Sequence, residues 1–183
     1  MKRRLTYIFF IVLLFGSLSS KAQNFTEYEV KAAYIFNFSK FIKWPSASFD
    51  NQASPYVLGI YGNDPFGSII KKIIGNRKSN GRNWVVKYYS RPDQIKQCHI
   101  LFISDIKPSE LRKVLDHTSK LPILTVGDEI NKFCQQGGEI NFTPKNSGKR
   151  FEINNKEANR AGLSISSKLL MLSKIISTDE VKF

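Results

Sequence analysis

Residues 55–70, PYVLGIYGNDPFGSII, change pattern in a way that decides the fold class. The run 56–62 is continuously apolar and rich in strand-forming residues, as in a strand buried on both faces of a sheet. Asp64 and Pro65 then supply the cap and first residue of a helix, whose isoleucines follow helical spacing until Gly75. The stretch predicts a strand, a loop and a helix.

The same unit recurs along the chain. Strands are expected at 84–89, 99–104 and 121–126, with a short helix after Pro92, a longer one at 108–119 and another short one from Asp128 to Gly137. Residues 139–142 and 150–154 are expected to pair as a hairpin around the turn 145–149, followed by two helical segments. We therefore predict one domain, residues 23–183, with a three-layer α/β fold: a mostly parallel central sheet flanked by helices, with a C-terminal antiparallel hairpin.

A helix is expected at 27–43, because Thr26 precedes two acids in the first turn and Pro45 ends the element. It has two apolar stripes, one with Val30, Ala33, Tyr34, Phe38, Phe41 and Ile42, the other with Ala32, Ile35 and Phe36. A helix that is apolar on two sides is either enclosed within its own fold or shared with another chain. Both alternatives stay open, and Tyr34, Ile35 and Phe36 are the candidates for contact with a second copy.

The N-terminus has the features of a secretory signal peptide, residues 1–22. Three basic residues precede an apolar run from Ile8 to Phe15, which is shorter than the ~20 residues needed to span a bilayer. Ser20 and Ala22 are small residues at the positions that signal peptidase prefers, so we expect cleavage after Ala22. The mature protein is then exported and does not span the membrane.

The chain is basic, and it stays basic after cleavage. The signal contains four of the 28 basic residues and none of the 15 acidic ones, so the mature chain has a net charge of +9. An exported protein rarely meets nucleic acid, and these cations are scattered without interleaved aromatic residues. We expect no nucleic-acid partner; the charge instead favours encounter with an anionic surface or an acidic partner.

Cys98 and Cys134 are the only cysteines. In an oxidising compartment they could form a disulfide. The residues around them give no sign that they meet, so two free buried thiols are the other alternative.

The turn 62–68 is the first candidate for a ligand site. It has two glycines at phosphate-loop spacing but lacks the lysine that such a loop requires, which argues against a nucleotide triphosphatase. An anion or small ligand could still bind at the start of the following helix, through Asn63, Asp64, Gly67 and Ser68. The alternatives are thus a plain capped turn, or a small-molecule-binding protein or hydrolase that uses this turn.

No other pattern indicates catalysis. Ser68 and Lys71 have the Ser-x-x-Lys spacing of penicillin-recognising enzymes, but no Lys-Thr-Gly accompanies them. His99 adjoins Cys98 on a strand, where neighbouring side chains face opposite sides, and His117 is isolated. We expect no catalytic residues, no metal site and no cofactor.

The segment RFEINNKEANRAGLSISSKLL, residues 150–170, is polar enough to suggest an active site. Its alternation instead predicts a strand that buries Phe151 and Ile153 and turns Glu152 outward. Asn154 or Asn155 would cap a helix that stops at Gly162, and residues 164–167 would cap a second helix. The buried stripe of that second helix would contain Leu169, Leu170, Leu172, Ile175 and Ile176.

Taken together, these residues resemble the YfiR-like family of periplasmic regulators. The similar positions are EYEVKAAY (27–34), Phe36-Asn37-Phe38, Phe41, Trp44-Pro45, Gly62 with Asp64 to Gly67, CHILFIS (98–104), LTVGD (124–128), Phe133 with Gly137-Gly138, and residues 151–154, 158, 161–163 and 165–170. They occur in the family's order and cover essentially the whole mature chain.

The resemblance implies a non-enzymatic periplasmic repressor. Such a protein would bind the periplasmic sensor region of an inner-membrane diguanylate cyclase, lower cyclic di-GMP and restrain biofilm formation. It also implies a homodimer, and we place the partner contact at Ile140 and Glu152 on the terminal hairpin. Some relatives have two disulfides, whereas Cys98 and Cys134 look like single members of those pairs. Asn141 stands where the local partner of Cys134 would be, so control by that bridge is not expected.

Overall fold

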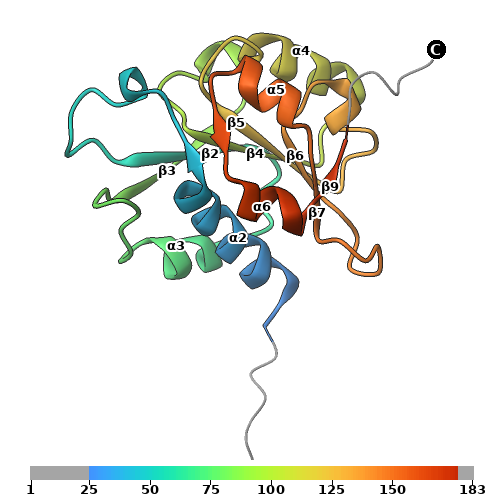
Figure 1. The fold of residues 1–183 in the computed structure, drawn as a ribbon, viewed down its shortest axis with the longest axis horizontal. Helices are drawn as coiled ribbons and strands as arrows, with labels where there is room; N and C mark the ends of the chain where they lie inside the picture. The colour runs from blue at the N-terminus through green and yellow to red at the C-terminus, as the bar shows by residue number, and fades with distance from the viewer. Residues whose placement is uncertain (1–24, 177–183) are drawn as a thin grey trace, which may run out of the picture.

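The strand of the opening stretch, β2 (Tyr56–Gly62), lies second from one edge of a seven-stranded sheet (Figure 1). The computed structural model describes residues 25–176, so the predicted signal peptide lies outside the described residues. The other strands are β3 (Trp84–Tyr89), β4 (Ile100–Ser104), β5 (Leu124–Asp128), β6 (Ile140–Phe142), β7 (Phe151–Ile153) and β9 (Lys174–Ile175). Their order across the sheet is β3-β2-β4-β5-β6-β7-β9.

The pairing confirms the predicted α/β class. The strands β3, β2, β4, β5 and β6 are parallel, as strands joined by helical crossovers must be. The strand β7 pairs antiparallel with β6, with Ile140 opposite Ile153, and this is the predicted hairpin. The last strand, β9, adds parallel to β7 at the edge.

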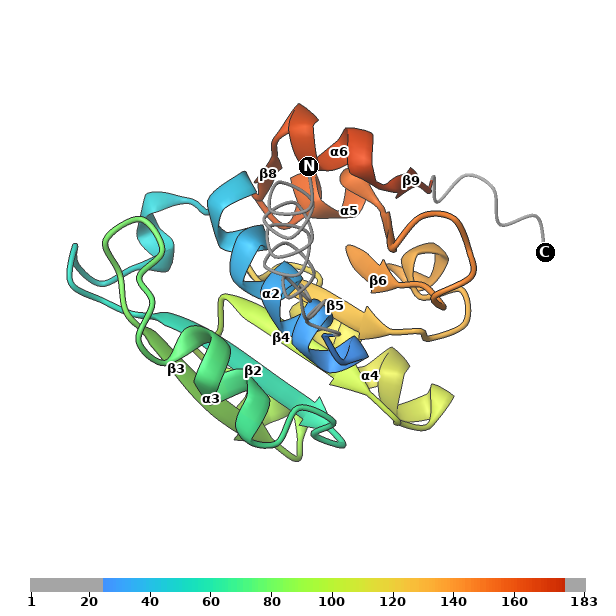
Figure 2. The ribbon, with the colours of Figure 1, turned by 90° about the horizontal axis from the view of Figure 1, so that it is seen from below.

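Two hydrophobic clusters separate the molecule into three layers. On one face lie α2 (Glu27–Phe41), α3 (Ser68–Ile74), α5 (Asn155–Arg160) and α6 (Ser167–Leu172), and on the other lies α4 (Pro108–Thr118) with the 3₁₀ turns η2 (Pro92–Gln94) and η3 (Cys134–Gln136). Strand residues alternate between the faces: Leu58 and Ile60 belong to the first cluster and Tyr61 to the second. Figure 2 shows α2 between α3 on one side and α6 on the other.

The helix α2 is buried in its own chain along the second apolar stripe and only partly along the first. Thr26 and Glu29 cap its N-terminus reciprocally, as expected from the acids in the first turn. Ala32, Ile35 and Phe36 of the second stripe lie in the same core cluster as Phe38 of the first. Internal burial therefore accounts for the second stripe.

Several predicted boundaries are wrong in ways that backbone geometry explains. The first helix ends at Phe41 instead of 43, because residues 42–43 form a two-residue strand, β1 (Ile42–Lys43), which pairs antiparallel with β8 (Ser164–Ile165). The helix α3 begins at Ser68 instead of Pro65, since Gly67 takes a left-handed φ of 51°. Strand β5 begins at Leu124, after a turn at 121–123, and runs to Asp128; of the short helix expected from Asp128, only η3 forms.

The C-terminal helix is the largest correction. It ends at Leu172, where Ser173 becomes extended at φ −102° and ψ 169°, and residues 174–175 join the sheet as β9. Leu172 and Ile175, which the sequence assigned to a buried stripe, are 59% and 53% exposed. The apolar spacing continues past the helix end, but only Leu172 and Ile175 lie on the surface; Ile176, the last member of the predicted stripe, is buried in the second hydrophobic cluster.

Candidate functional site

The glycine turn after β2 is closed by its own side chains. The Oδ1 atom of Asp64 accepts hydrogen bonds from the backbone N–H groups of Phe66, at 2.9 Å, and Gly67, at 3.3 Å, while Oδ2 accepts from the Tyr88 hydroxyl at 3.1 Å. The Asp64 carboxylate thus already accepts hydrogen bonds from the backbone N–H groups that would otherwise bind an incoming anion. Asn63, Asp64, Gly67 and Ser68 lie in this one turn, and its hydrogen bonds favour the plain capped turn.

His99 is held within the fold through both ring nitrogens and the face of its ring. The backbone N–H of Val57 donates to Nδ1 at 3.0 Å, and Nε2 lies 2.9 Å from the carbonyl oxygen of Ser48, to which it can donate. The ring stacks on Phe49 with centroids 4.3 Å apart. Burial lowers the pKa of His99. The neutral imidazole joins β2 to the loop before it, and His117 is exposed on α4, away from this cluster.

Both cysteines are free and buried. The thiol of Cys98 donates to the carbonyl of Ile100 at 3.0 Å, and that of Cys134 lies 3.8 Å from the carbonyl of Glu139. Burial raises the pKa of the Cys98 thiol to about 12 and raises that of Cys134 further. Of the two alternatives left by the sequence, the structure has two free thiols, held in the unreactive protonated form.

Among residues 25–176, no three His, Cys, Asp or Glu side chains are arranged to hold a metal ion. Within the same range, none of the helices is long and apolar enough to cross a membrane.

The structure reveals a charge cluster around Lys31 that the sequence did not indicate. The Lys31 ammonium lies 2.6 Å from carboxylate oxygens of Glu27 and Asp128 and 2.8 Å from one of Glu129. The Tyr28 hydroxyl donates to Asp128 as well, at 3.3 Å. The cluster therefore ties the first turns of α2 to the carboxyl end of β5, about a hundred residues later in the chain.

Electrostatics keep this lysine charged. Burial of the side chain opposes its charge, but the hydrogen bonds to Asp128, Glu129 and Glu27 outweigh that effect and raise the pKa of Lys31. The same ion pair lowers the pKa of Glu27. The sequence did not indicate this cluster because the two acids lie 97 and 98 residues after the lysine, and no recognisable spacing connects residues that far apart.

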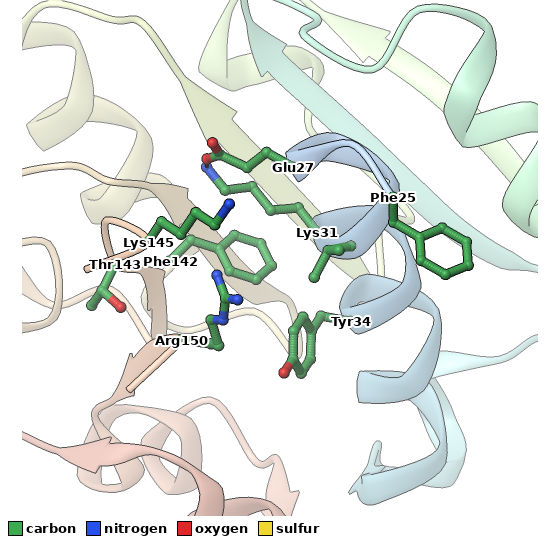
Figure 3. A pocket seen from close by; sticks show the side chains of 9 residues that line it. Phe25, Glu27, Lys31, Tyr34, Phe142, Thr143, Lys145 and Arg150 are labelled. Atoms are coloured by element: carbon green, nitrogen blue, oxygen red, sulfur yellow. Dashed lines mark ion pairs between the residues drawn. The ribbon is translucent and has the colours of Figure 1, made fainter. Parts of the chain in front are cut away.

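A cavity of about 180 Å³ adjoins the cluster (Figure 3). It lies between the first half of α2 and the connection from β6 to β7. Its lining residues are Phe25, Glu27, Val30, Lys31, Tyr34, Phe142, Thr143, Lys145 and Arg150. This is the carboxyl side of β5 and β6, where α/β sheets commonly bind ligands.

The two residues predicted to contact a partner differ in accessibility. Ile140 is 0% exposed in the core, so it has no surface to offer, and this burial is inconsistent with a direct partner contact. Glu152 points away from the core cluster that contains Phe151 and Ile153, as the alternation predicted, but its side chain is only 14% exposed and its carboxylate lies 3.1 Å from the Lys174 ammonium on β9. Glu152 remains a candidate contact and Ile140 becomes a supporting core residue.

The three residues predicted for self-association also differ. Ile35 is 0% and Phe36 5% exposed, and both lie within the core of this chain. Tyr34 is half-buried, with its ring 5.3 Å from that of Phe151. Of the three, only Tyr34 keeps appreciable surface for a second copy.

Three exposed apolar side chains lie near the C-terminal edge of the sheet, where Glu152 pairs with Lys174. Met171 and Leu172 at the end of α6 are 71% and 59% exposed, and Ile175 on β9 is 53% exposed. We call these three residues, with Glu152 and Lys174, the C-terminal face. The available sequence signal was Ser173-Lys174, a polar pair that interrupts the apolar spacing before the last isoleucines.

Comparison with known proteins agrees with this architecture. Residues 28–174 match the model of the YfiR/HmsC-like family, from the first turn of α2 to the beginning of β9. A comparison with curated proteins gives no match. Because the family match spans well over half of the sequence and nearly all of the described fold, the chain belongs to the YfiR/HmsC-like family.

Proposed function

We propose that this protein is a periplasmic repressor that binds the periplasmic sensor region of an inner-membrane signalling protein, a diguanylate cyclase, and holds it inactive. Loss of the repressor would raise cyclic di-GMP and favour biofilm formation. Family membership over residues 28–174 is the observation that carries the proposal. The protein would act by stoichiometric binding and not by catalysis.

The C-terminal face supports a binding role. Three of the six large hydrophobic side chains that are exposed among residues 25–176 fall within positions 171–175. An apolar patch beside charged groups is typical of a protein interaction site. Glu152 and Lys174 would provide orientation at its rim, and Met171, Leu172 and Ile175 would provide buried area on binding.

The face is held in place by the rest of the fold. Register pairs Glu152 with Lys174, and the Ile176 backbone N–H donates to the carbonyl of Ile153 at 2.8 Å. The Lys149 ammonium donates to the carbonyl of Met171 at 3.2 Å, which links the hairpin turn to the end of α6. A partner would therefore meet a largely preformed surface, which lowers the entropic cost of binding.

Deleting the gene and measuring cellular cyclic di-GMP tests the proposal. We expect a rise that the wild-type gene reverses and that Met171→Glu does not, because a charge on the C-terminal face would have to be buried against the partner. Val85→Glu is a matched control, since Val85 is exposed on β3 at the other edge of the sheet. Unchanged cyclic di-GMP after deletion would contradict the proposal.

The role of Glu152 needs a variant that separates folding from recognition. Glu152→Lys alone also sets a like charge against Lys174, so loss of binding could reflect a damaged edge strand. Exchanging the pair, Glu152→Lys with Lys174→Glu, keeps the attraction between β7 and β9. If a partner reads the carboxylate, the exchanged pair folds normally yet still fails to repress; full repression would remove Glu152 from the contact surface.

We also propose that the protein forms a homodimer, with Tyr34 as a contact. Light scattering on the purified protein should give the mass of two chains, and Tyr34→Asp should shift it toward one. A monomeric wild-type protein across the micromolar range would contradict this part of the proposal and leave the repressor role to be judged separately.

A further inference from the structure

We propose that the cavity between α2 and the β6–β7 connection is a binding site for a small organic anion, a carboxylate with an apolar body. The site is distinct from the C-terminal face and does not depend on the repressor role. Lys145 and Arg150 would bind the carboxylate, and the half-buried Tyr34 and Val30 would contact the apolar part.

The charges around the cavity fall into two groups. Lys31 is satisfied by three carboxylates within 2.8 Å and has little left to offer a ligand. Arg150, in contrast, has no ion-pair partner among residues 25–176, and the ammonium of Lys145 makes no hydrogen bond or close ion pair there. Figure 3 shows the charged ends of both side chains directed toward the space beside Phe142. Both side chains are exposed to solvent, so it is their convergence on one cavity that favours an anionic ligand.

The wall of the cavity opposite the cations is apolar and aromatic. Val30 lies one turn before Tyr34 on the same side of α2, and behind them the buried ring of Phe142 has its centroid 6.2 Å from that of Tyr34. Such a wall offers little to a bare phosphate or sulfate but stabilises a hydrocarbon or aromatic group. The ligand therefore needs an apolar part as well as a charge.

The volume of the cavity and the rigidity of its walls further limit which ligands can bind. About 180 Å³ is below the ~300–1,000 Å³ of sites for drug-sized ligands, so the occupant is small. The connection that bears the cations is held by hydrogen bonds: the Thr143 backbone N–H donates to the Arg150 carbonyl at 3.1 Å, and the Ser147 hydroxyl donates to the Pro144 carbonyl at 2.6 Å. The anion-binding side is thus anchored on the hairpin and the apolar side on a core helix.

Calorimetric titration of the exported, purified protein with phenylacetate tests the inference. Inorganic phosphate supplies the charge without the apolar body, and 2-phenylethanol supplies the body without the charge. We expect saturable one-to-one binding of phenylacetate and little heat from the other two. Arg150→Gln should weaken binding about tenfold or more and Lys145→Gln by a smaller factor, as expected for loss of hydrogen bonds to a charged group.

Arg112→Gln is the matched control, because Arg112 is exposed on α4 on the opposite face of the sheet. It should bind phenylacetate as the wild type does, and circular dichroism should show all three variants folded. Equal affinity in Arg150→Gln, or tighter binding of phosphate than of phenylacetate, would overturn the proposed ligand class. Absence of saturable binding by both phenylacetate and hexanoate up to about 10 mM, weaker than any Kd of functional use, would overturn the site.

Discussion

Glu139 is a fully enclosed acid whose ionisation the fold opposes. The residue is 3% exposed, and its Oε2 accepts a hydrogen bond from the backbone N–H of Thr125 at 2.8 Å and another from the Thr125 hydroxyl. Burial raises the pKa of Glu139 to about 7 despite these bonds. Because the folded pKa is above the unfolded one, the stability contributed by this group is present below pH 4.5 and is lost as the pH rises through about 7.

Glu139→Gln should remove this pH dependence. A glutamine keeps an acceptor for the Thr125 backbone N–H but cannot ionise, so the variant should be more stable than the wild type at about pH 8. The gain is on the order of 3 kcal/mol at most and should nearly vanish at about pH 4. Urea unfolding at both pH values measures it, with Asp116→Asn on exposed α4 as a control; an equal stability difference at the two pH values would contradict the assignment.

His99 should produce a pH dependence of the opposite sign. Burial lowers its pKa, so the neutral ring is favoured in the fold; its contribution is present above pH 6.5 and is lost as the pH falls through the folded pKa. Protonation would put a hydrogen on Nδ1 and break the bond from the Val57 N–H. The effect is best measured by urea unfolding in the Glu139→Gln background, where His99→Asn should abolish the loss of stability on acidification. If stability is still lost on acidification in His99→Asn, another group is responsible for the pH dependence.

At the scale of single residues, sequence reasoning succeeded where a local rule decides the outcome. Asn154 caps α5 by accepting from the Glu157 backbone N–H at 3.1 Å, and Gly162 takes the left-handed φ of 77° that ends the segment. It failed for Ile140 because alternation indicates which residues share a face but not which face is covered. Nothing in the local sequence marked Glu139 as a buried acid.

Among the elements, α2 is fixed at its first turns by charge and along its length by apolar packing. Lys31→Met should destabilise the protein by on the order of 3 kcal/mol, because the buried Asp128 carboxylate would face Glu129 and Glu27 without a cation. Adding Asp128→Asn should restore part of that loss, which a double-mutant cycle in urea measures. Lys113→Met, exposed on α4, should be nearly neutral. Strict additivity of the Lys31 and Asp128 variants would show that the pair does not couple.

Sequence reasoning recovered the long elements and missed the shortest ones. The strands β1, β8 and β9 have two residues each, and their pairing joins segments separated by about 20 to 120 residues. No periodicity exists within two residues, so such strands follow only from tertiary contacts. The prediction of a continuous C-terminal helix failed for this reason, and with it the prediction that Leu172 and Ile175 are buried.

At the scale of the whole molecule, the features that could suggest an enzyme have structural uses. The Asp64 turn is closed upon itself, His99 uses both ring nitrogens, and the Cys98 thiol is held protonated in the core. Three of the six exposed large hydrophobic side chains among residues 25–176 instead lie on the C-terminal face, at the edge of the sheet. In this fold, these polar groups form hydrogen bonds within the protein, and apolar side chains are exposed at one edge of the sheet. Such a surface suits a binding module, in agreement with membership of the YfiR/HmsC-like family.

Crosslinking in intact cells tests this account most directly. A photoreactive amino acid at Met171 should capture one inner-membrane protein that has a periplasmic region and a cytoplasmic diguanylate cyclase domain, whereas the same amino acid at Val85 should not. Purified membranes containing that protein should synthesise less cyclic di-GMP when the purified protein is added. Capture of no membrane protein at position 171, or a captured cyclase whose rate does not change on this addition, would contradict the proposed function.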